Sequence, residues 1–262
     1  MKVLVLGGTG YLGSAIVSAL HQSGHDAVVA SRNPRAGDRF ADLGDPASLA
    51  ATVTPDIDAV VHAAAADADW DVQADGVRAL LHALPGRPLV YTSGVWVLGA
   101  TSEPVDETAE VRPIALVSGR PAIERLVLDG GGVVIRPGVL HGGGRGLVEL
   151  LDGRYVGAAT TTWPMVHVDD AARLFVTALE RAKPGTLLHA VAEPGIRVVD
   201  LATARGGSAK PWANASTDLG SAFAEALALS QVVTAPAARA LGWEPCERSA
   251  LANAVAPAGP VR

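Results

Sequence analysis

Residues 2–13, with the sequence KVLVLGGTGYLG, decide the fold. The first five of them form a short apolar run, which is typical of a strand buried on both faces of a parallel sheet. A glycine-rich turn follows, in which Gly7, Gly10 and Gly13 are evenly spaced. The apolar residues from Tyr11 to Ser23 recur at helical spacing, so a helix is predicted there. Because a strand, a glycine turn and a helix follow one another, this stretch predicts the first half of a βαβ unit.

The glycines have the spacing GxxGxxG, which is typical of a dinucleotide-binding turn. The first permits a tight turn, the second lets the backbone approach a pyrophosphate, and the third allows the helix to pack closely on the strand. The start of the helix offers free N–H groups and the positive end of its dipole to the phosphates. The residues predicted to bind the cofactor here are Gly7, Thr9, Gly10, Tyr11, Leu12 and Gly13.

The end of the second predicted strand, residues 25–30, distinguishes NAD from NADP. Proteins that bind NAD carry a carboxylate there, which holds the ribose 2′-hydroxyl. This chain instead continues with Ser31, Arg32, Asn33, Pro34 and Arg35. An arginine can bind a 2′-phosphate through two hydrogen bonds, and a serine hydroxyl can add a third. We therefore predict NADP(H) as the cofactor, with Ser31, Arg32 and Arg35 at its 2′-phosphate; the alternative is that both arginines belong to a solvated loop.

Strands and helices continue to alternate after this unit. Helices are predicted at residues 46–53, 75–83 and 121–128, and strands at 59–62, 88–91 and 132–136. This alternation predicts an α/β protein with a Rossmann-like, doubly wound parallel sheet. The rhythm weakens after about residue 140. We expect a single domain over residues 1–262, in which residues 1–140 carry the cofactor. Residues 141–262 form mainly a small substrate-side lobe with returning strands and helices, a mobile glycine loop at 141–146 and a frayed tail.

Composition excludes several classes of protein. The formal net charge is -6 and no basic stripe occurs, so a nucleic-acid partner is not expected. No run of about 18 apolar residues is present to span a membrane. The single cysteine, Cys246, cannot form an internal disulfide, which favours the cytoplasm. The histidines lack metal-ligand spacing, so no metal site is expected. We expect a small-molecule substrate and leave the oligomeric state open.

Further short motifs follow in a fixed order along the chain. They are Asp42-Leu43, HAAA at residues 62–65, VYTS at 90–93, PVDE at 104–107, RPGVLHG at 136–142 and VHVDD at 166–170. With the glycine motif, they resemble the extended or atypical short-chain dehydrogenase/reductases of the NAD-dependent epimerase/dehydratase group, over roughly residues 1–175. The resemblance implies that Asp42 and Leu43 hold the adenine. It also implies further cofactor contacts from Ala63, Ala64, Ala65, Thr92, Pro137, Gly138 and Val139.

The family's Ser-Tyr-Lys catalytic triad is missing from this chain. None of the three tyrosines, Tyr11, Tyr91 and Tyr155, has a lysine four residues later, so the family's YxxxK motif does not occur. Alignment on Glu124, which resembles the family's acidic residue four after the lysine, and on the serine-rich loop gives the replacements. Gly94 stands at the serine position, Leu116 at the tyrosine position and Arg120 at the lysine position.

These replacements change the expected chemistry. Leu116 cannot transfer a proton, whereas Arg120 can still hydrogen-bond the nicotinamide ribose and is predicted to bind the cofactor. Ser93 is the best remaining catalytic candidate and would position or polarise a carbonyl; Ser118, Tyr155 and His141 come behind it. General acid–base help is worth roughly 10² to 10⁴ in rate, so hydride transfer can survive its loss if positioning remains. The proton would then come from the substrate or from water.

The sequence leaves the function open between three hypotheses. The favoured one is an NADPH-dependent ketoreductase acting on a polyketide or polyphenolic natural product, as the resemblance to angucyclinone-type polyketide ketoreductases implies. Trp96, Trp163 and Trp212 are candidates to line its aromatic substrate pocket. The alternative is an NADP(H)-binding redox sensor without catalysis. A non-redox isomerase or cyclase is the third, because a fold does not fix a function.

Overall fold

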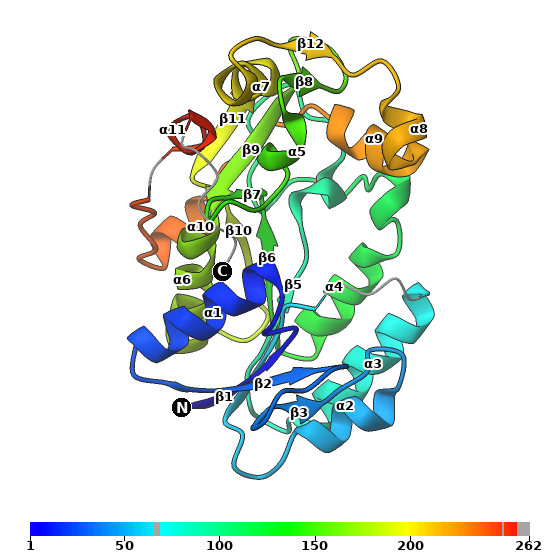
Figure 1. Cartoon of the computed structure of the whole chain (residues 1–262). Helices are drawn as coiled ribbons and strands as arrows, with labels where there is room; N and C mark the ends of the chain where they lie inside the picture. The colour runs from blue at the N-terminus through cyan, green and yellow to red at the C-terminus, as the bar shows by residue number, and fades with distance from the viewer. Residues whose placement is uncertain (65–68, 248, 256–262) are drawn as a thin grey trace.

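Seven parallel strands form the central sheet of the protein (Figure 1). The structure is a computed structural model that describes residues 1–64, 69–247 and 249–255. The strands lie in the order β3-β2-β1-β4-β5-β6-β10, and every neighbouring pair is parallel. This is the doubly wound Rossmann order, extended by one strand, so the predicted fold is confirmed. Their bounds are β1 Lys2–Leu6, β2 Asp26–Ser31, β3 Arg39–Phe40, β4 Ala59–His62, β5 Leu89–Thr92, β6 Val133–Pro137 and β10 Leu187–Ala190.

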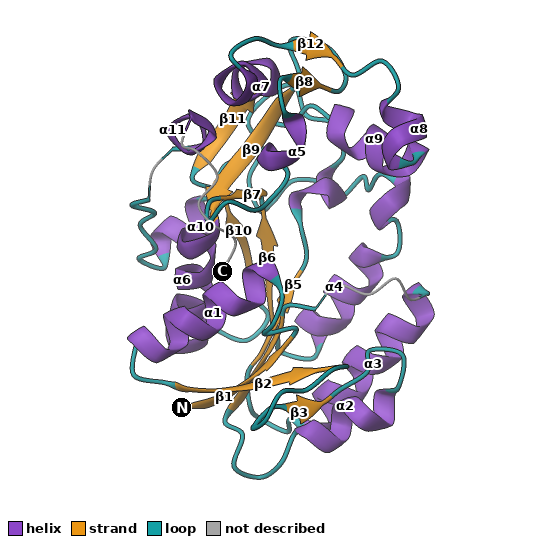
Figure 2. Cartoon of the chain, in the orientation of Figure 1, coloured by secondary structure: helices purple, strands orange, loops and turns teal. Residues whose placement is uncertain are grey.

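Helices cover both faces of this sheet, and β1 shows why (Figure 2). Val3 and Val5 point to one face, where they join a core with α1 (Tyr11–Gln22) and α6 (Val168–Arg181). Leu4 and Leu6 point to the other face, where they join a core with α2 (Pro46–Thr52), α3 (Trp70–Ala83) and α4 (Arg120–Asp129). Alternate side chains of a strand point to opposite faces, so a strand between two helical layers must be apolar throughout.

A smaller lobe lies beyond the carboxyl ends of the strands, at the top of Figure 1. Its three-stranded sheet has the order β11-β9-β7, and a two-stranded sheet pairs β12 with β8. Trp163, Met165 and Leu201 are buried in its own core. The bounds are β7 Val139–His141, β8 Arg154–Tyr155, β9 Thr162–His167, β11 Glu193–Arg197, β12 Lys210–Pro211, α5 Val148–Leu151, α7 Val198–Gly206, α8 Ala215–Leu219, α9 Ser221–Ala228, α10 Pro236–Ala240 and α11 Ala250–Val255.

The chain crosses between the two parts after residue 140. Between β9 and β11, α6 packs against α1, and β10 joins the edge of the central sheet beside β6. The late VHVDD motif, residues 166–170, leads into α6. His167 caps the first turn of this helix, because its Nδ1 accepts a hydrogen bond from the Asp169 N–H at 3.2 Å. In the described part of the chain, no helix is both long and apolar enough for a membrane crossing.

Most predicted boundaries agree with the structure to within one or two residues, and α3 is the exception. The prediction starts it at Asp75, whereas it starts at Trp70. Asp69 caps this earlier start by accepting a hydrogen bond from the Asp71 N–H at 3.1 Å. The extra turn brings Trp70 and Gln73 to the cavity described below. The predicted tail at residues 256–262 lies outside the described residues.

Candidate functional site

Two adjoining cavities lie at the carboxyl ends of the central strands. One, of about 540 Å³, is lined by residues that follow β1, β2 and β4. The other, of about 620 Å³, is lined by the ends of β5 and β6 and by the start of α4. Tyr11, Leu12 and Leu140 line both cavities, so the two are adjacent. Ligands of open α/β sheets bind at this edge, where the strand order reverses.

The glycine turn forms one wall of the smaller cavity, and its glycines allow close backbone packing there. Gly7 has a φ of +79°, and a Cβ on it would lie 2.6 Å from the Cα of Ala64. A Cβ on Gly13 would lie 2.0 Å from the carbonyl oxygen of Gly7, so only glycine lets α1 approach the turn this closely. No side chain caps α1 at Gly10, which leaves the first turn of the helix suited to an anion.

One end of the smaller cavity is formed by the last residues of β2 and by the turn that follows this strand. Of the predicted residues, Ser31, Arg32, Leu43, Ala63 and Ala64 line this cavity together with Gly7, Thr9, Gly10, Tyr11 and Leu12. Asn33 also lines it and was not predicted. Ala65 lies outside the described residues.

Three described residues predicted to bind the cofactor line neither cavity, namely Gly13, Asp42 and Arg35. Gly13 serves the close packing of α1 on the Gly7 carbonyl instead. The Asp42 carboxylate accepts a hydrogen bond from the Gly44 N–H at 2.9 Å, so it serves its own turn. Arg35 is exposed, and its backbone N–H donates to the Asp38 carboxylate at 3.1 Å. Of the two arginines considered for the 2′-phosphate, Arg32 alone faces this space among the described lining residues.

Three buried polar atoms along the two cavities have no hydrogen-bond partner among the described residues. They are Ser31 Oγ in the smaller cavity and Thr92 Oγ1 and Arg120 Nε in the larger one. Buried polar groups in folded proteins nearly always have partners. A dinucleotide lying across both cavities would supply them, because its phosphates and ribose hydroxyls accept and donate hydrogen bonds. Together with the glycine turn, these residues fit a nicotinamide adenine dinucleotide.

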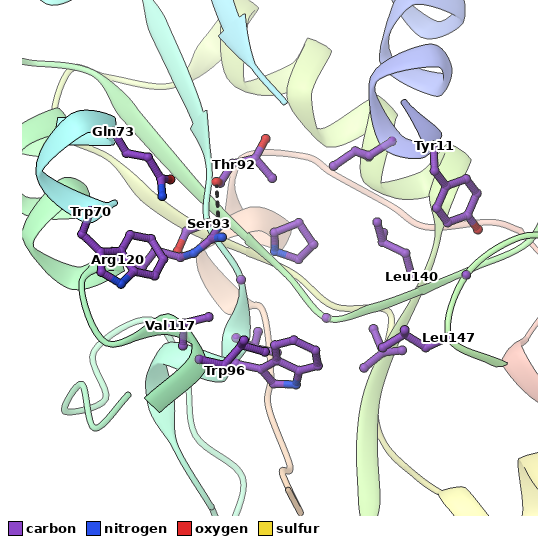
Figure 3. A pocket seen from close by; sticks show the side chains of 18 residues that line it. Tyr11, Trp70, Gln73, Thr92, Ser93, Trp96, Val117, Arg120, Leu140 and Leu147 are labelled. Atoms are coloured by element: carbon purple, nitrogen blue, oxygen red, sulfur yellow. Dashed lines mark hydrogen bonds between the residues drawn. The ribbon is translucent and has the colours of Figure 1, made fainter. Parts of the chain in front are cut away.

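The larger cavity is mostly apolar (Figure 3). Its lining comprises Tyr11, Leu12, Trp70, Gln73, Thr92, Ser93, Gly94, Val95, Trp96, Leu116, Val117, Arg120, Pro137, Gly138, Val139, Leu140, Gly146 and Leu147. This lining includes five residues that were predicted to bind the cofactor, namely Thr92, Arg120, Pro137, Gly138 and Val139. Among the described residues that line it, Tyr11 and Arg120 are the ionisable ones, so the walls hold little charge.

The tryptophan prediction is correct for one residue of three. Trp96 lines the larger cavity and packs edge-on against Phe223, with ring centroids 6.4 Å apart. Trp163 is instead buried in the core of the small lobe, where its Nε1 donates to the Leu227 carbonyl at 3.0 Å. Trp212 lies near the surface, with Arg154 over its ring. Both sit on the small lobe, whose packing the sequence pattern does not reveal.

Trp70 is the aromatic residue that the sequence reasoning missed. It lines the cavity, stands under the Arg120 guanidinium at 5.9 Å, and occupies the space over Gly119, where a Cβ would lie 2.1 Å from its ring. Gly119 was the one available signal, because a glycine directly before a helix often marks a close approach.

Ser93 lies in the cavity wall and is held by a buried ion pair. Its Oγ donates a hydrogen bond to Glu124 Oε1. Arg136 donates to both oxygens of the same carboxylate, from Nε at 2.9 Å and from Nη2 at 2.5 Å. All three side chains are buried. The prediction that Ser93 polarises a carbonyl is not what this geometry provides, because polarising needs a donor and the hydroxyl hydrogen is engaged by Glu124.

The other candidate proton donors are poorly placed. Tyr11 donates its hydroxyl to the Gly142 carbonyl at 2.7 Å, and burial raises its pKa above the ordinary value. His141 does not line either cavity; it packs against the His167 ring with centroids 5.3 Å apart, and burial lowers its pKa to about 4. Ser118 and Tyr155 are absent from the described linings of both cavities. Within the described ranges, no cluster of three or more possible metal ligands occurs.

The position of the missing YxxxK motif spans the gap between two helical segments. Leu116 lies in a 3₁₀ turn, η2 (Ala115–Val117), and Arg120 is the first residue of α4. The Arg120 Nη1 donates to the Thr92 carbonyl at 3.2 Å, which holds the guanidinium across the end of β5. The arrangement can bind a dinucleotide and an apolar molecule beside it, with little help for proton transfer from the described residues.

Comparisons with known proteins find similarity over most of the chain. Residues 3–119 match the model of the NAD dependent epimerase/dehydratase family. The chain is 29% identical over 232 residues to an uncharacterized protein of Schizosaccharomyces pombe, which covers 77% of this chain and 78% of that protein. It is 28% identical over 224 residues to the human epimerase family protein SDR39U1, which covers 73% of this chain and 75% of the human one.

A solved structure of the human protein extends this likeness to the fold. The crystal structure of human SDR39U1 with NADPH superposes with a TM-score of 0.81, at 24% identity, over 97% of this chain and 98% of that one. Together, these comparisons show that the chain is similar to the NAD dependent epimerase/dehydratase family over residues 3–119 and to human SDR39U1 over most of its length.

Proposed function

We propose that this chain is an NADPH-dependent ketoreductase that reduces a ketone on an aromatic molecule, such as a polyketide or polyphenolic natural product. The observation that carries the proposal is the apolar cavity of about 620 Å³ that adjoins the dinucleotide cleft. Apolar cavities with a few polar groups are the usual sites for small organic ligands. Trp70 and Trp96 in its wall favour a flat, aromatic substrate.

The choice of NADPH rests on Arg32 and on the human relative. Arg32 faces the adenosine end of the cleft, and no carboxylate among the described residues lines that end. The crystal structure of human SDR39U1 contains NADPH. When bound, NADPH would supply a hydride to the ketone carbon. Because a cell keeps this nucleotide reduced in the cytoplasm, and the chain has one cysteine, we place its activity there.

The chain's own residues would bind and orient the reactants. Arg120 Nε and Thr92 Oγ1 would take ribose hydroxyls as partners, which their burial without partners favours. Leu116, Val117 and Trp96 would exclude water and hold the substrate ring. Arg120 stays protonated and Tyr11 is a weak acid, so the proton for the new alcohol would come from a hydroxyl of the substrate or from water.

Turnover and cofactor binding test the proposal together. NADPH affinity is measured first by calorimetry. NADPH oxidation is then followed by absorbance with tetralones, naphthoquinones and acyclic ketones, and products are weighed by mass spectrometry. A product two hydrogens heavier than its ketone supports the reductase. Tight NADPH binding without turnover of any ketone would overturn it and favour the redox sensor.

Two tryptophan variants test whether the cavity is the substrate site. Trp96→Ala removes an aromatic wall and should raise the KM for an aromatic ketone about tenfold, with NADPH affinity unchanged. Trp212→Ala is the matched control, because this residue does not line the cavity. An equal effect of both variants would place the substrate elsewhere.

A further inference from the structure

We infer that Ser93 accepts a hydrogen bond from a hydroxyl group of the substrate, and that the site therefore selects ketones that also carry a hydroxyl. This inference rests on the proposed function, because it deepens the assignment of the same cavity. Ser93 is among the residues that line this cavity in Figure 3. What decides its role is the direction of its own hydrogen bond.

The direction follows from the chemistry of Glu124. Two hydrogen bonds from a guanidinium to both carboxylate oxygens mark Glu124 as ionised, and an ionised carboxylate can only accept. Ser93 must therefore be the donor in its contact with Glu124 Oε1. A hydroxyl has one hydrogen and two lone pairs, so Ser93 has acceptor capacity left and no hydrogen left.

The hydroxyl is held in this orientation. The Ser93 backbone N–H donates to the Ile135 carbonyl at 2.7 Å, and Ser93, Glu124 and Arg136 are all buried. Turning the hydrogen toward the cavity would break a charge-assisted hydrogen bond in a buried site, where such bonds are strongest.

A residue that only accepts discriminates between ligands. A phenol or alcohol hydroxyl can donate to Ser93, whereas a methyl ether at the same place cannot. A carboxylate or phosphate group can only accept hydrogen bonds, so its oxygens would face the lone pairs of the Ser93 hydroxyl without a hydrogen between them. Such ligands are therefore disfavoured. The ligand class is therefore a hydroxylated ketone that directs its hydroxyl group, and not its carbonyl oxygen, at Ser93.

Matched pairs of ketones test the inference by binding alone. The probes are 5-, 6- and 7-hydroxy-1-tetralone and their methyl ethers, titrated by calorimetry into the full chain saturated with NADP⁺. We expect at least one hydroxytetralone to bind about three- to tenfold more tightly than its ether, which is the net contribution of one hydrogen bond. In Ser93→Ala and Ser93→Gly this preference should disappear. Ser118→Ala, outside the described cavity lining, should keep it.

The outcomes separate this inference from the proposed function. If no hydroxytetralone is preferred over its ether, or if the preference survives in both Ser93 variants, the role of Ser93 is overturned, even when ketones are reduced. A hydroxyl preference that depends on Ser93, in a protein that oxidises no NADPH, supports the acceptor role and overturns the reductase. NADP⁺ affinity close to that of the parent shows that each variant is folded.

Discussion

At the scale of single residues, the end of β2 separates two arginines that look equivalent in the sequence. Arg32 lines the adenosine end of the cleft, whereas Arg35, three positions later, lies outside it in an exposed turn. A guanidinium that reaches a 2′-phosphate makes charge-assisted hydrogen bonds, which only NADP can receive. The two residues therefore form a natural pair of test and control.

Arg32→Ala should weaken NADPH binding roughly 10- to 100-fold and leave NADH binding within about twofold. The hydrogen bond that this variant loses is made to the charged 2′-phosphate, which NADH does not carry. Arg35→Ala should change neither affinity appreciably. Calorimetric titration of both nucleotides into both variants measures this. Equal losses for NADPH and NADH in Arg32→Ala would contradict the NADP assignment.

At the scale of elements, the approach to α4 explains why the family's proton route is absent. The YxxxK motif needs one continuous helix, because residues four apart then lie on the same face. Here Leu116 lies in η2, and α4 begins only at Arg120, with Pro121 as its second residue. Gly119 between them is packed against Trp70. Restored side chains would not regain the family's relative placement.

The triple variant Gly94→Ser, Leu116→Tyr, Arg120→Lys should therefore raise kcat for the best aromatic ketone by less than tenfold. The serine can be accommodated, because a Cβ on Gly94 meets its nearest neighbour, the Pro137 carbonyl oxygen, only at 4.0 Å. Steady-state kinetics beside the single variant Gly94→Ser give the comparison. A gain of about 100-fold or more, the usual worth of a general acid, would show that the family's route had only been interrupted.

At the scale of the whole molecule, buried neutral histidines link stability to pH. Burial lowers the pKa of His62 to about 4, and the Arg120 charge acts in the same direction. The pKa of His141 is lowered to about 4, first by burial. Between pH 6.5 and 4 the unfolded chain binds protons that the folded chain refuses, so the free energy of unfolding decreases as the pH falls.

His62→Gln should flatten this dependence, because glutamine is neutral in both states. Below pH 6.5 the slope of unfolding free energy against pH should fall by up to one proton, about 1.4 kcal/mol per pH unit. His82→Gln, at an exposed position of α3, should leave the slope unchanged. Urea unfolding between pH 7 and 4.5 measures both. A slope equal to that of the parent in His62→Gln would show that this histidine binds as many protons in the folded chain as in the unfolded chain, so that its pKa is not lowered by folding.

The sequence predicted the part of the site that local chemistry specifies. The glycine turn, Ser31, Arg32 and Thr92 are where the motifs placed them, because a turn fixes the residues that follow a strand. The sequence did not predict the roles of residues that depend on their tertiary surroundings. Trp70 reaches the cavity because Asp69 starts α3 early, and Ser93 loses its donor role to Glu124, which lies 31 residues away in the chain.

What the sequence by itself determined is the Rossmann-like sheet and the dinucleotide cleft. Both depend on short-range patterns, namely apolar strands buried on two faces and glycines at fixed spacing. Tertiary structure alone decided which of the tryptophans face the larger cavity, which arginine lines the smaller one, and which way the Ser93 hydrogen points. These depend on contacts between separate elements of the chain, such as the hydrogen bond from Ser93 to Glu124, which is 31 residues later, and no local periodicity encodes them.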